Sequence, residues 1–374
     1  MRLYRWDGSI LALAPGATMR RHFICLLIVC ATACLMSAAR AADHVDITWM
    51  SITNHYLDFG KTRLVADGYI TRLPQSLFSG GGGGLARTSR GTRPDEAAVR
   101  EVFDAIGGRP AVNLLITGHS HFDHSFDTPV WARLAHARII GSASTCLQTE
   151  AANIPAGRCR TVIGGERIAI GGGVTMHVVR WNHSGDSTKN PEQHDPHELA
   201  RVPVPDASGG LHAGVAEDFP NGGGNRAYLF VIDAPGGPLS MFFQDSASAV
   251  DLAAPVVVDG HDYGAPIENL RRALHDAGLK SVDLWIGTGG ADVAALVLPV
   301  LRPAAYLPVH WDGLFGPFKS GVPGPFADAQ LEALLAAAGV VLVRPAQYMD
   351  KWRLDRTGVH ALDNRAVKIR LGLR

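Results

Sequence analysis

Three histidines and an aspartate lie within six residues of one another, in the stretch Gly118-His119-Ser120-His121-Phe122-Asp123-His124. Imidazole nitrogens and carboxylate oxygens are typical ligands of zinc and related ions. His119 and His121 are separated by one residue, so a strand end or tight loop can point both the same way. Asp123 and His124 follow and can reach a second ion. Burying so many polar groups without partners is costly, which disfavours a role in packing alone.

Three further residues of the same chemical type follow predicted strands. His183 comes after the strand expected at 174–180, Asp245 after that at 239–243, and His310 after that at 304–309. Each residue has another explanation when it is taken alone: His183 as a loop histidine, Asp245 as a strand-end cap and His310 as a core histidine. Their shared placement at strand ends favours one common site, because catalytic sites are built from such convergent groups.

The spacing of residues 119–124 is the HxHxDH motif, and on it the chain resembles the metallo-β-lactamase superfamily. The motif follows a short apolar run at 111–117, which is typical of a buried strand. The resemblance extends over roughly residues 45–355. It implies an α/β fold, the αββα sandwich, in which two mixed sheets pack face to face with helices outside.

The resemblance also implies a role for each candidate residue. His119, His121 and His183 resemble the ligands of a first metal ion, and Asp123, His124 and His310 those of a second. Asp245 resembles the carboxylate that bridges both ions. Asp67, which ends an early strand, is similar to a residue that orients ligands without binding metal.

Two divalent ions would lower the pKa of a shared water, so that hydroxide is available near neutral pH. We therefore expect a hydrolase that uses a metal-bridged hydroxide, with Asp123 also relaying a proton and with no serine or cysteine nucleophile. The resemblance to the superfamily favours zinc as the metal, and manganese or iron also suit these ligands. The substrate is a small molecule whose binding residues are not readable from the sequence.

Two shorter segments resemble the branch that contains ascorbate-phosphate lactonase-like proteins and N-acyl phosphatidylethanolamine phospholipase D. They are Ile47-Thr48-Trp49 and the segment from His310-Trp311 to Phe315, although Met50-Ser51 stands where the branch has glycine-histidine. Asp245 resembles the bridging aspartate of those members of the superfamily that cleave phosphodiesters, lactones or thioesters. We expect cleavage of a phosphodiester, lactone or carboxylic ester. The alternatives are a β-lactam hydrolase, a di-iron redox enzyme and a non-catalytic metal-binding periplasmic protein.

Strands and helices alternate along the rest of the chain, which favours a layered α/β fold. Helices are expected at 94–106, 129–137, 266–277, 292–301 and 326–338, and further strands at 45–49, 62–67, 137–140, 227–232, 282–286, 340–343 and 348–353. Residues 184–224 are expected to form one long loop that contains His194, His197 and His212. The five glycines at 80–84 are expected to form a flexible lid or linker.

The N-terminus has the pattern of a secretory signal peptide. A basic stretch at 19–22, an apolar run at 23–36 and the small-x-small pattern Ala39-Arg40-Ala41 follow one another. We expect residues 1–41 to be the signal, with Met19 as the true start, and 42–374 to be a single catalytic domain. The protein would then be periplasmic or secreted, and lipidation at Cys34 is not favoured.

Two cysteines, Cys146 and Cys159, remain after such a signal. An oxidising compartment favours a disulfide between them, and two buried thiols are the alternative. The 35 basic and 35 acidic residues balance, so charge gives no reason to expect a nucleic-acid partner. No stretch of the mature chain is long and apolar enough for a stable membrane span. The oligomeric state is not readable.

Overall fold

The computed structural model describes residues 42–373, so the predicted signal peptide lies outside the described residues. These described residues belong to one compact unit. Within residues 42–373, no helix is long and apolar enough to cross a membrane.

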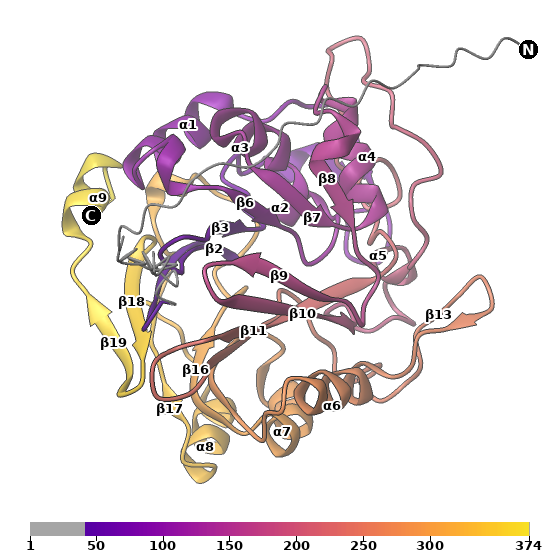
Figure 1. Cartoon of the computed structure of the whole chain (residues 1–374). Coiled ribbons are helices and arrows are strands. Elements are labelled where there is room, and N and C mark those ends of the chain that lie inside the picture. The colour runs from indigo at the N-terminus through magenta and orange to yellow at the C-terminus, as the bar shows by residue number, and fades with distance from the viewer. Residues whose placement is uncertain (1–41, 374) are drawn as a thin grey trace, which may run out of the picture. The chain divides into compact units, whose positions relative to one another are not determined.

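Two large mixed sheets form the centre of this unit (Figure 1). The eight-stranded sheet runs, in spatial order, β19 (Gly358–Leu362), β18 (Asp350–Asp355), β1 (Val45–Ser51), β2 (Asn54–Asp58), β3 (Arg63–Ala66), β6 (Leu114–Ile116), β7 (Arg138–Gly141) and β8 (Cys159–Thr161). The seven-stranded sheet runs β17 (Val341–Leu342), β16 (Pro303–Pro308), β15 (Val282–Gly287), β12 (Leu239–Phe243), β11 (Asn225–Ile232), β10 (Val174–Trp181) and β9 (Arg167–Gly171).

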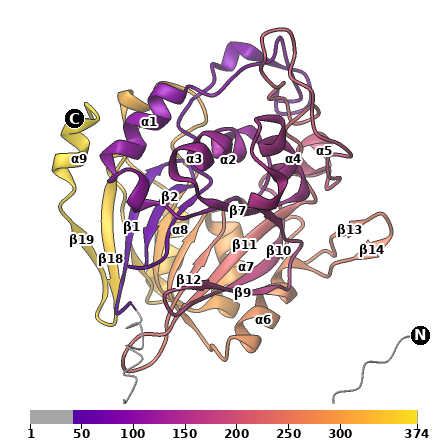
Figure 2. The same cartoon turned by 45° about the horizontal axis from the view of Figure 1, so that its top comes forward.

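Helices cover the outer face of each sheet (Figures 1 and 2). The eight-stranded sheet carries α1 (Glu96–Ala105), α2 (Phe122–Ser125), α3 (Thr128–Ala135) and α4 (Ala143–Ala151), and the seven-stranded sheet carries α6 (Pro266–Asp276), α7 (Gly290–Leu301) and α8 (Ala329–Ala337). The order helix, sheet, sheet, helix is the αββα sandwich, which confirms the expected fold class. The smaller elements are α5 (Pro191–His194), α9 (Arg365–Arg370) and the hairpins β4 (Phe78–Ser79)–β5 (Arg87–Thr88) and β13 (Val257–Val258)–β14 (His261–Asp262).

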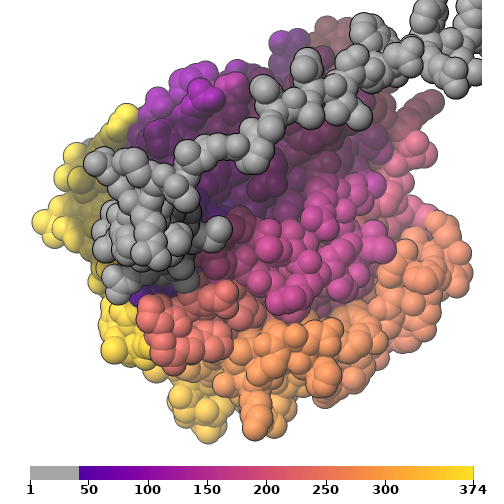
Figure 3. All heavy atoms as spheres, viewed as in Figure 1, coloured from indigo at the N-terminus to yellow at the C-terminus, as the bar shows by residue number. Residues whose placement is uncertain are grey.

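Strand β10 shows why the second sheet is apolar on both faces. Met176 and Val178 point into the cluster between the sheets, whereas Val179 and Trp181 point into the cluster under α6–α8. Successive strand residues face opposite sides, so a strand covered on both sides needs an apolar residue at nearly every position. In the space-filling view of the same face, side chains occupy the space between the layers seen as ribbons (Figure 3).

Several elements were not expected from the sequence. Strand β2 carries polar residues, and the edge strands β8 and β9 are short. None of these three strands has a strong apolar run. Helix α4 has no wide apolar face, but Ser142 caps it by accepting a hydrogen bond from the Thr145 amide. The predicted disulfide between Cys146 and Cys159 is present and joins α4 to β8, with the two Cα atoms 5.5 Å apart.

Candidate metal centre

The predicted site residues follow the ends of strands that run in the same direction. β3 and β6 are parallel neighbours, and β12, β15 and β16 form a second parallel set. The carboxyl ends of parallel strands meet at one edge of a sheet, where α/β proteins place their ligands. Strand β10 runs in the same direction as β12, because each is antiparallel to β11. The carboxyl ends of β3 and β6 in one sheet and of β10, β12 and β16 in the other precede all eight predicted site residues, namely Asp67, His119, His121, Asp123, His124, His183, Asp245 and His310.

Gly118, directly before the motif, lets the two sheets approach closely. A Cβ atom at this position would lie 2.0 Å from Oδ2 of Asp245, which is far inside contact distance. The Gly118 amide donates a hydrogen bond to Oδ1 of Asp67 at 3.0 Å. Any larger residue here would push Asp245 away, so Gly118 is required for the site to assemble.

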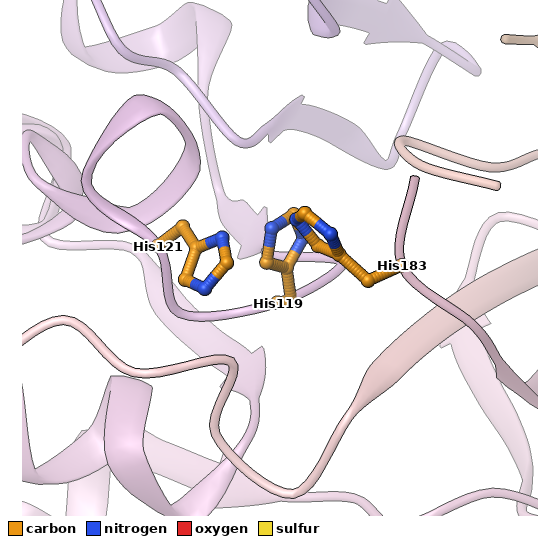
Figure 4. Close-up of side chains that lie close together, drawn as sticks. All are labelled: His119, His121 and His183. Carbon is orange, nitrogen blue, oxygen red and sulfur yellow. The ribbon is translucent and has the colours of Figure 1, made fainter. Parts of the chain in front are cut away.

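His119, His121 and His183 form a first group of potential ligands. Their ring centroids lie 4.6 Å (119 to 121), 5.0 Å (119 to 183) and 4.7 Å (121 to 183) apart. One ring nitrogen from each lies within 4.8 Å of the others. Figure 4 shows the three rings gathered around one space. Within residues 42–373, Nε2 of His119 and of His121 is buried without a hydrogen-bond partner.

Asp123, His124 and His310 form a second group. Oδ2 of Asp123 lies 3.1 Å from Nε2 of His124 and 3.3 Å from Nε2 of His310. The His124 contact lacks hydrogen-bond geometry, because this Nε2 is also without a hydrogen-bond partner among the described residues. The His310 side chain is 20% exposed, which makes it the most open member of this group. The second group therefore marks the solvent side of the centre.

Asp245 lies between the two groups. Its Oδ2 is 2.8 Å from Nδ1 of His119 and 3.3 Å from Nδ1 of His124. Oδ1 accepts a hydrogen bond from the Asn225 side-chain amide at 3.1 Å. His119, His124 and Asp245 thereby form a third set of potential ligand atoms that links the other two.

Asp67 contacts His124 of the second group. Its Oδ2 is 3.1 Å from Nδ1 of His124 and accepts a hydrogen bond from the Thr53 hydroxyl at 2.6 Å. Thr53 lies in the turn between β1 and β2, and nothing in the local sequence indicated its role. A carboxylate at Nδ1 fixes the ring and leaves Nε2 free for a metal ion, which is how orienting residues act.

The two groups differ in charge. Burial lowers the pKa values of His119 and His183 well below the ordinary value, and lowers that of His121 to about 3. Burial acts on His124 in the same direction, but three neighbouring carboxylates outweigh it and raise its pKa. Burial alone would raise the pKa of Asp123, yet His124 and His310 hold it well below its usual range.

Asp312 secures the segment that delivers His310. Its carboxylate accepts hydrogen bonds from the Ile52 amide at 3.0 and 3.1 Å and from the Tyr348 hydroxyl at 2.8 Å. Arg72 pairs with it at 3.3 Å, and both side chains are buried. His310 has the left-handed φ of 63° and donates its amide to the Ile52 carbonyl. The network therefore holds His310 in an unfavourable backbone conformation.

The aromatic residues that flank the ligands pack into the protein. Phe122 is fully buried and lies 4.5 Å from the Phe78 ring, which in turn lies 5.8 Å from Phe315. Trp311 stacks on Trp49 at 5.6 Å. Of these side chains, Phe78, Phe315 and Trp311 are partly exposed.

The histidines of the long loop are placed differently from one another. His194 contacts His183, whereas the His197 side chain is 61% exposed beside Asp195. His212 lies near Thr88 and belongs to none of the sets of potential ligand atoms. The loop is also less irregular than expected, because α5 forms inside it.

The solved structures that are similar to this chain are distant from it in sequence. No family model and no curated protein matches the sequence. A metallo hydrolase from the archaeon Ignicoccus hospitalis is 12% identical, with a TM-score of 0.46, over 83% of this chain and 98% of its own. A possible metal-dependent hydrolase from Veillonella parvula is 12% identical (TM-score 0.45; 82% and 98%). A metallo-β-lactamase fold protein from Bacillus subtilis is 10% identical (0.43; 83% and 99%).

Proposed function

We propose that this protein is a metal-dependent hydrolase with two divalent ions, which cleaves an ester-type bond. The observation that carries the proposal is the pair of ligand groups, each with its donor atoms within 4.8 Å of one another. His119, His121 and His183 would hold the first ion, and Asp123, His124 and His310 the second. Asp245 links the groups, and Asp67 orients His124. Zinc suits this set of nitrogen and oxygen ligands, as do manganese and iron.

The residues present fit such ions. Nδ1 of His119 faces the Asp245 carboxylate, so in the neutral ring Nδ1 carries the proton and the lone pair of Nε2 is free. A buried, unpartnered nitrogen is costly unless something binds it. The low pKa values of His119, His121 and His183 keep these rings neutral, as metal ligands must be.

Two bound divalent ions would supply a water of lowered pKa and would stabilise negative charge on the reacting group. The chain itself supplies positioning and proton handling. Oδ2 of Asp123 lies 3.1 Å from Nε2 of His124 and 3.3 Å from Nε2 of His310, and we assign the relay of a proton between these groups to it. Ser120 donates its hydroxyl to the Pro220 carbonyl at 2.6 Å and is thus not placed as a nucleophile. Cys146 and Cys159 are joined in the disulfide.

The disulfide also supports a proposal on location. Such bonds persist in oxidising compartments and are rare in the cytosol. We therefore keep the periplasm or the extracellular space as the place where the chain acts. We also propose that the chain is similar to the branch that contains lactonase-like proteins and N-acyl phosphatidylethanolamine phospholipase D.

Turnover by the purified chain tests the function. The chain would be loaded with zinc or manganese and given a chromogenic phosphodiester, a lactone, a carboxylic ester and a cephalosporin. We expect metal-dependent hydrolysis of one of the first three classes. Hydrolysis of the cephalosporin alone would favour the β-lactam alternative. Two tightly bound ions with no turnover of any substrate would favour a metal-binding protein without catalysis.

A further inference from the structure

A cavity with a volume of about 290 Å³ lies between helix α6, strand β10 and the turn at 164–166. None of the eight predicted site residues lines it, so it belongs to neither ligand group of the metal centre. The residues of its wall that carry charge or can titrate are Glu166, His177, Arg180, Tyr263, Arg272 and Asp276.

Arg180 is a buried cation of this cavity and lacks a counter-ion. The residue is only 4% exposed. Within residues 42–373 it forms no ion pair, and its guanidinium makes one hydrogen bond, from Nη1 to the Ile163 carbonyl at 3.1 Å. Its Nε is buried without a hydrogen-bond partner among the same residues. Arg226, its cross-strand neighbour on β11, is also buried but pairs with Glu198 at 3.1 Å.

The guanidinium of Arg180 stays charged in this position. Burial, followed by the like charge of Arg226, lowers the pKa of Arg180 to about 10, which is still above neutral pH. The Tyr263 ring offsets part of the cost of burial through a cation–π contact, with its centroid 4.3 Å from Cζ of Arg180. A buried charge without an ionic partner remains destabilising. An anion in the cavity would supply the missing counter-charge.

Arg272 brings a second guanidinium to the same end of the cavity. A Cβ atom at Gly264, the residue after Tyr263, would lie 3.1 Å from Nη2 of Arg272. This Nη2 donates a hydrogen bond to Oδ1 of Asn269. The side-chain amide of Asn269 in turn donates to the Arg180 carbonyl at 3.2 Å. Asn269 and the Tyr263 segment therefore bring the two arginines together.

The acidic residues of the cavity do not neutralise these arginines. The two carboxylate oxygens of Glu166 accept hydrogen bonds from the backbone amides of Ile163 and Gly164, at 2.7 and 2.8 Å. Asp276 lies four residues after Arg272 on α6, with Oδ1 3.2 Å from Nδ1 of His275. Neither carboxylate forms an ion pair with an arginine of the cavity, so its Tyr263 end is cationic.

We propose that this cavity binds a small molecule through a phosphate or carboxylate group held by Arg180 and Arg272. A guanidinium presents a planar fork of N–H donors that matches the oxygens of both groups. The volume of about 290 Å³ lies at the lower end of the range for small-molecule sites, which favours a compact ligand. The inference goes beyond the proposed function and does not depend on it, because no metal ligand takes part.

Calorimetric titration of the purified chain with inorganic phosphate and with acetate tests the proposal and separates the two groups. Phosphate can also bind to metal ions, so the titration uses the wild type and His121→Ala, in which the metal centre is incomplete. We expect an anion site that persists in His121→Ala, and the tighter of the two anions identifies the group. Anion binding that disappears in His121→Ala would overturn the proposal, as would no binding of either anion at millimolar concentration.

Substitutions of the arginines locate the site. Arg180→Met should weaken anion binding by about 10- to 100-fold, which is the scale of hydrogen bonds to a charged group. Arg272 is exposed, so Arg272→Gln should leave the fold intact while it weakens binding by about tenfold. Arg271→Gln is the matched control, because Arg271 is its neighbour on α6 and pairs with Glu268. Equal affinities in Arg272→Gln and Arg271→Gln would overturn the proposal, whether or not Arg180→Met folds.

Discussion

The two ligand groups of the metal centre differ in how far they satisfy themselves without a cation. In the first group, His119, His121 and His183 are neutral rings that offer one another no opposite charge. In the second group, Asp123 lies within 3.3 Å of ring nitrogens of both His124 and His310. The first group is therefore arranged for an external positive charge, whereas the second already contains an ion pair between Asp123 and His124. Metal binding should be coupled to proton release mainly in the second group.

Removal of a ligand from the first group should have the largest effect. His121→Ala takes away one of three nitrogens that have no substitute nearby. We expect loss of one bound ion per chain and a fall in kcat/KM greater than the roughly hundredfold that loss of a supporting residue costs. Metal analysis and steady-state kinetics measure both, with His197→Ala as the control. Full activity in His121→Ala would be incompatible with the metal mechanism.

Removal of a supporting carboxylate should have a smaller effect, confined to the second group. Asp67→Asn weakens the contact that orients the His124 ring, whose Nδ1 lies 3.1 Å from Oδ2 of Asp67. We expect the metal affinity of the second group to fall about 10- to 100-fold. Metal titration by calorimetry should show one weakened and one unchanged site. Equal weakening of both sites would mean that the two groups are not separable in this way.

Acid should destabilise the metal-free protein through the first group. Burial lowers the pKa of His121 from 6.5 to about 3, so the unfolded chain binds a proton that the folded chain refuses between these pH values. Above pH 6.5 the His121 ring is neutral in both states and does not lower the free energy of unfolding. As the pH falls from 6.5 towards 3, proton uptake by the unfolded chain lowers this free energy. Denaturant unfolding of the metal-free chain should show this slope, and His121→Ala should flatten it. An unchanged slope would contradict the neutral state of this ring.

The disulfide should have the smallest effect on the centre. Cys146 and Cys159 lie 13 positions apart in the sequence and join α4 to β8, at the edge of the sheet opposite β19. The double variant Cys146→Ser, Cys159→Ser should lose about 3 kcal/mol of stability on the chain-entropy model. Thermal unfolding measures this loss, and metal content should remain at the wild-type level. A drop in bound metal would show that the centre depends on this edge of the sheet.

The ligand types could be read from the sequence because they depend on short-range patterns. Residues 119–124 are adjacent in the chain, and His183, Asp245 and His310 each follow an apolar run that predicts a strand. Strand direction then brings these ends to one edge. The αββα architecture followed from the resemblance, and the strands and helices with strong apolar periodicity were found close to their observed bounds.

The supporting contacts could not be predicted, because they join residues far apart in the chain. Arg72 meets Asp312 across 240 positions and Tyr348 across 276. Thr53 and Asn225 carry no local pattern that distinguishes them from other polar residues. The same holds for His194, which differs from the exposed His197 only in what the fold places around it.

The sequence by itself determined which atoms are available for metal binding and on which strand ends they lie, since residue type and periodicity are local properties. The tertiary structure alone decided how these atoms divide into a neutral and an ion-paired group, because burial and charge neighbours depend on the packing of both sheets. It also decided that the glycine run at 80–84 lies against the segment at 189–193, because a close approach of two loops exists only once both loops are in place.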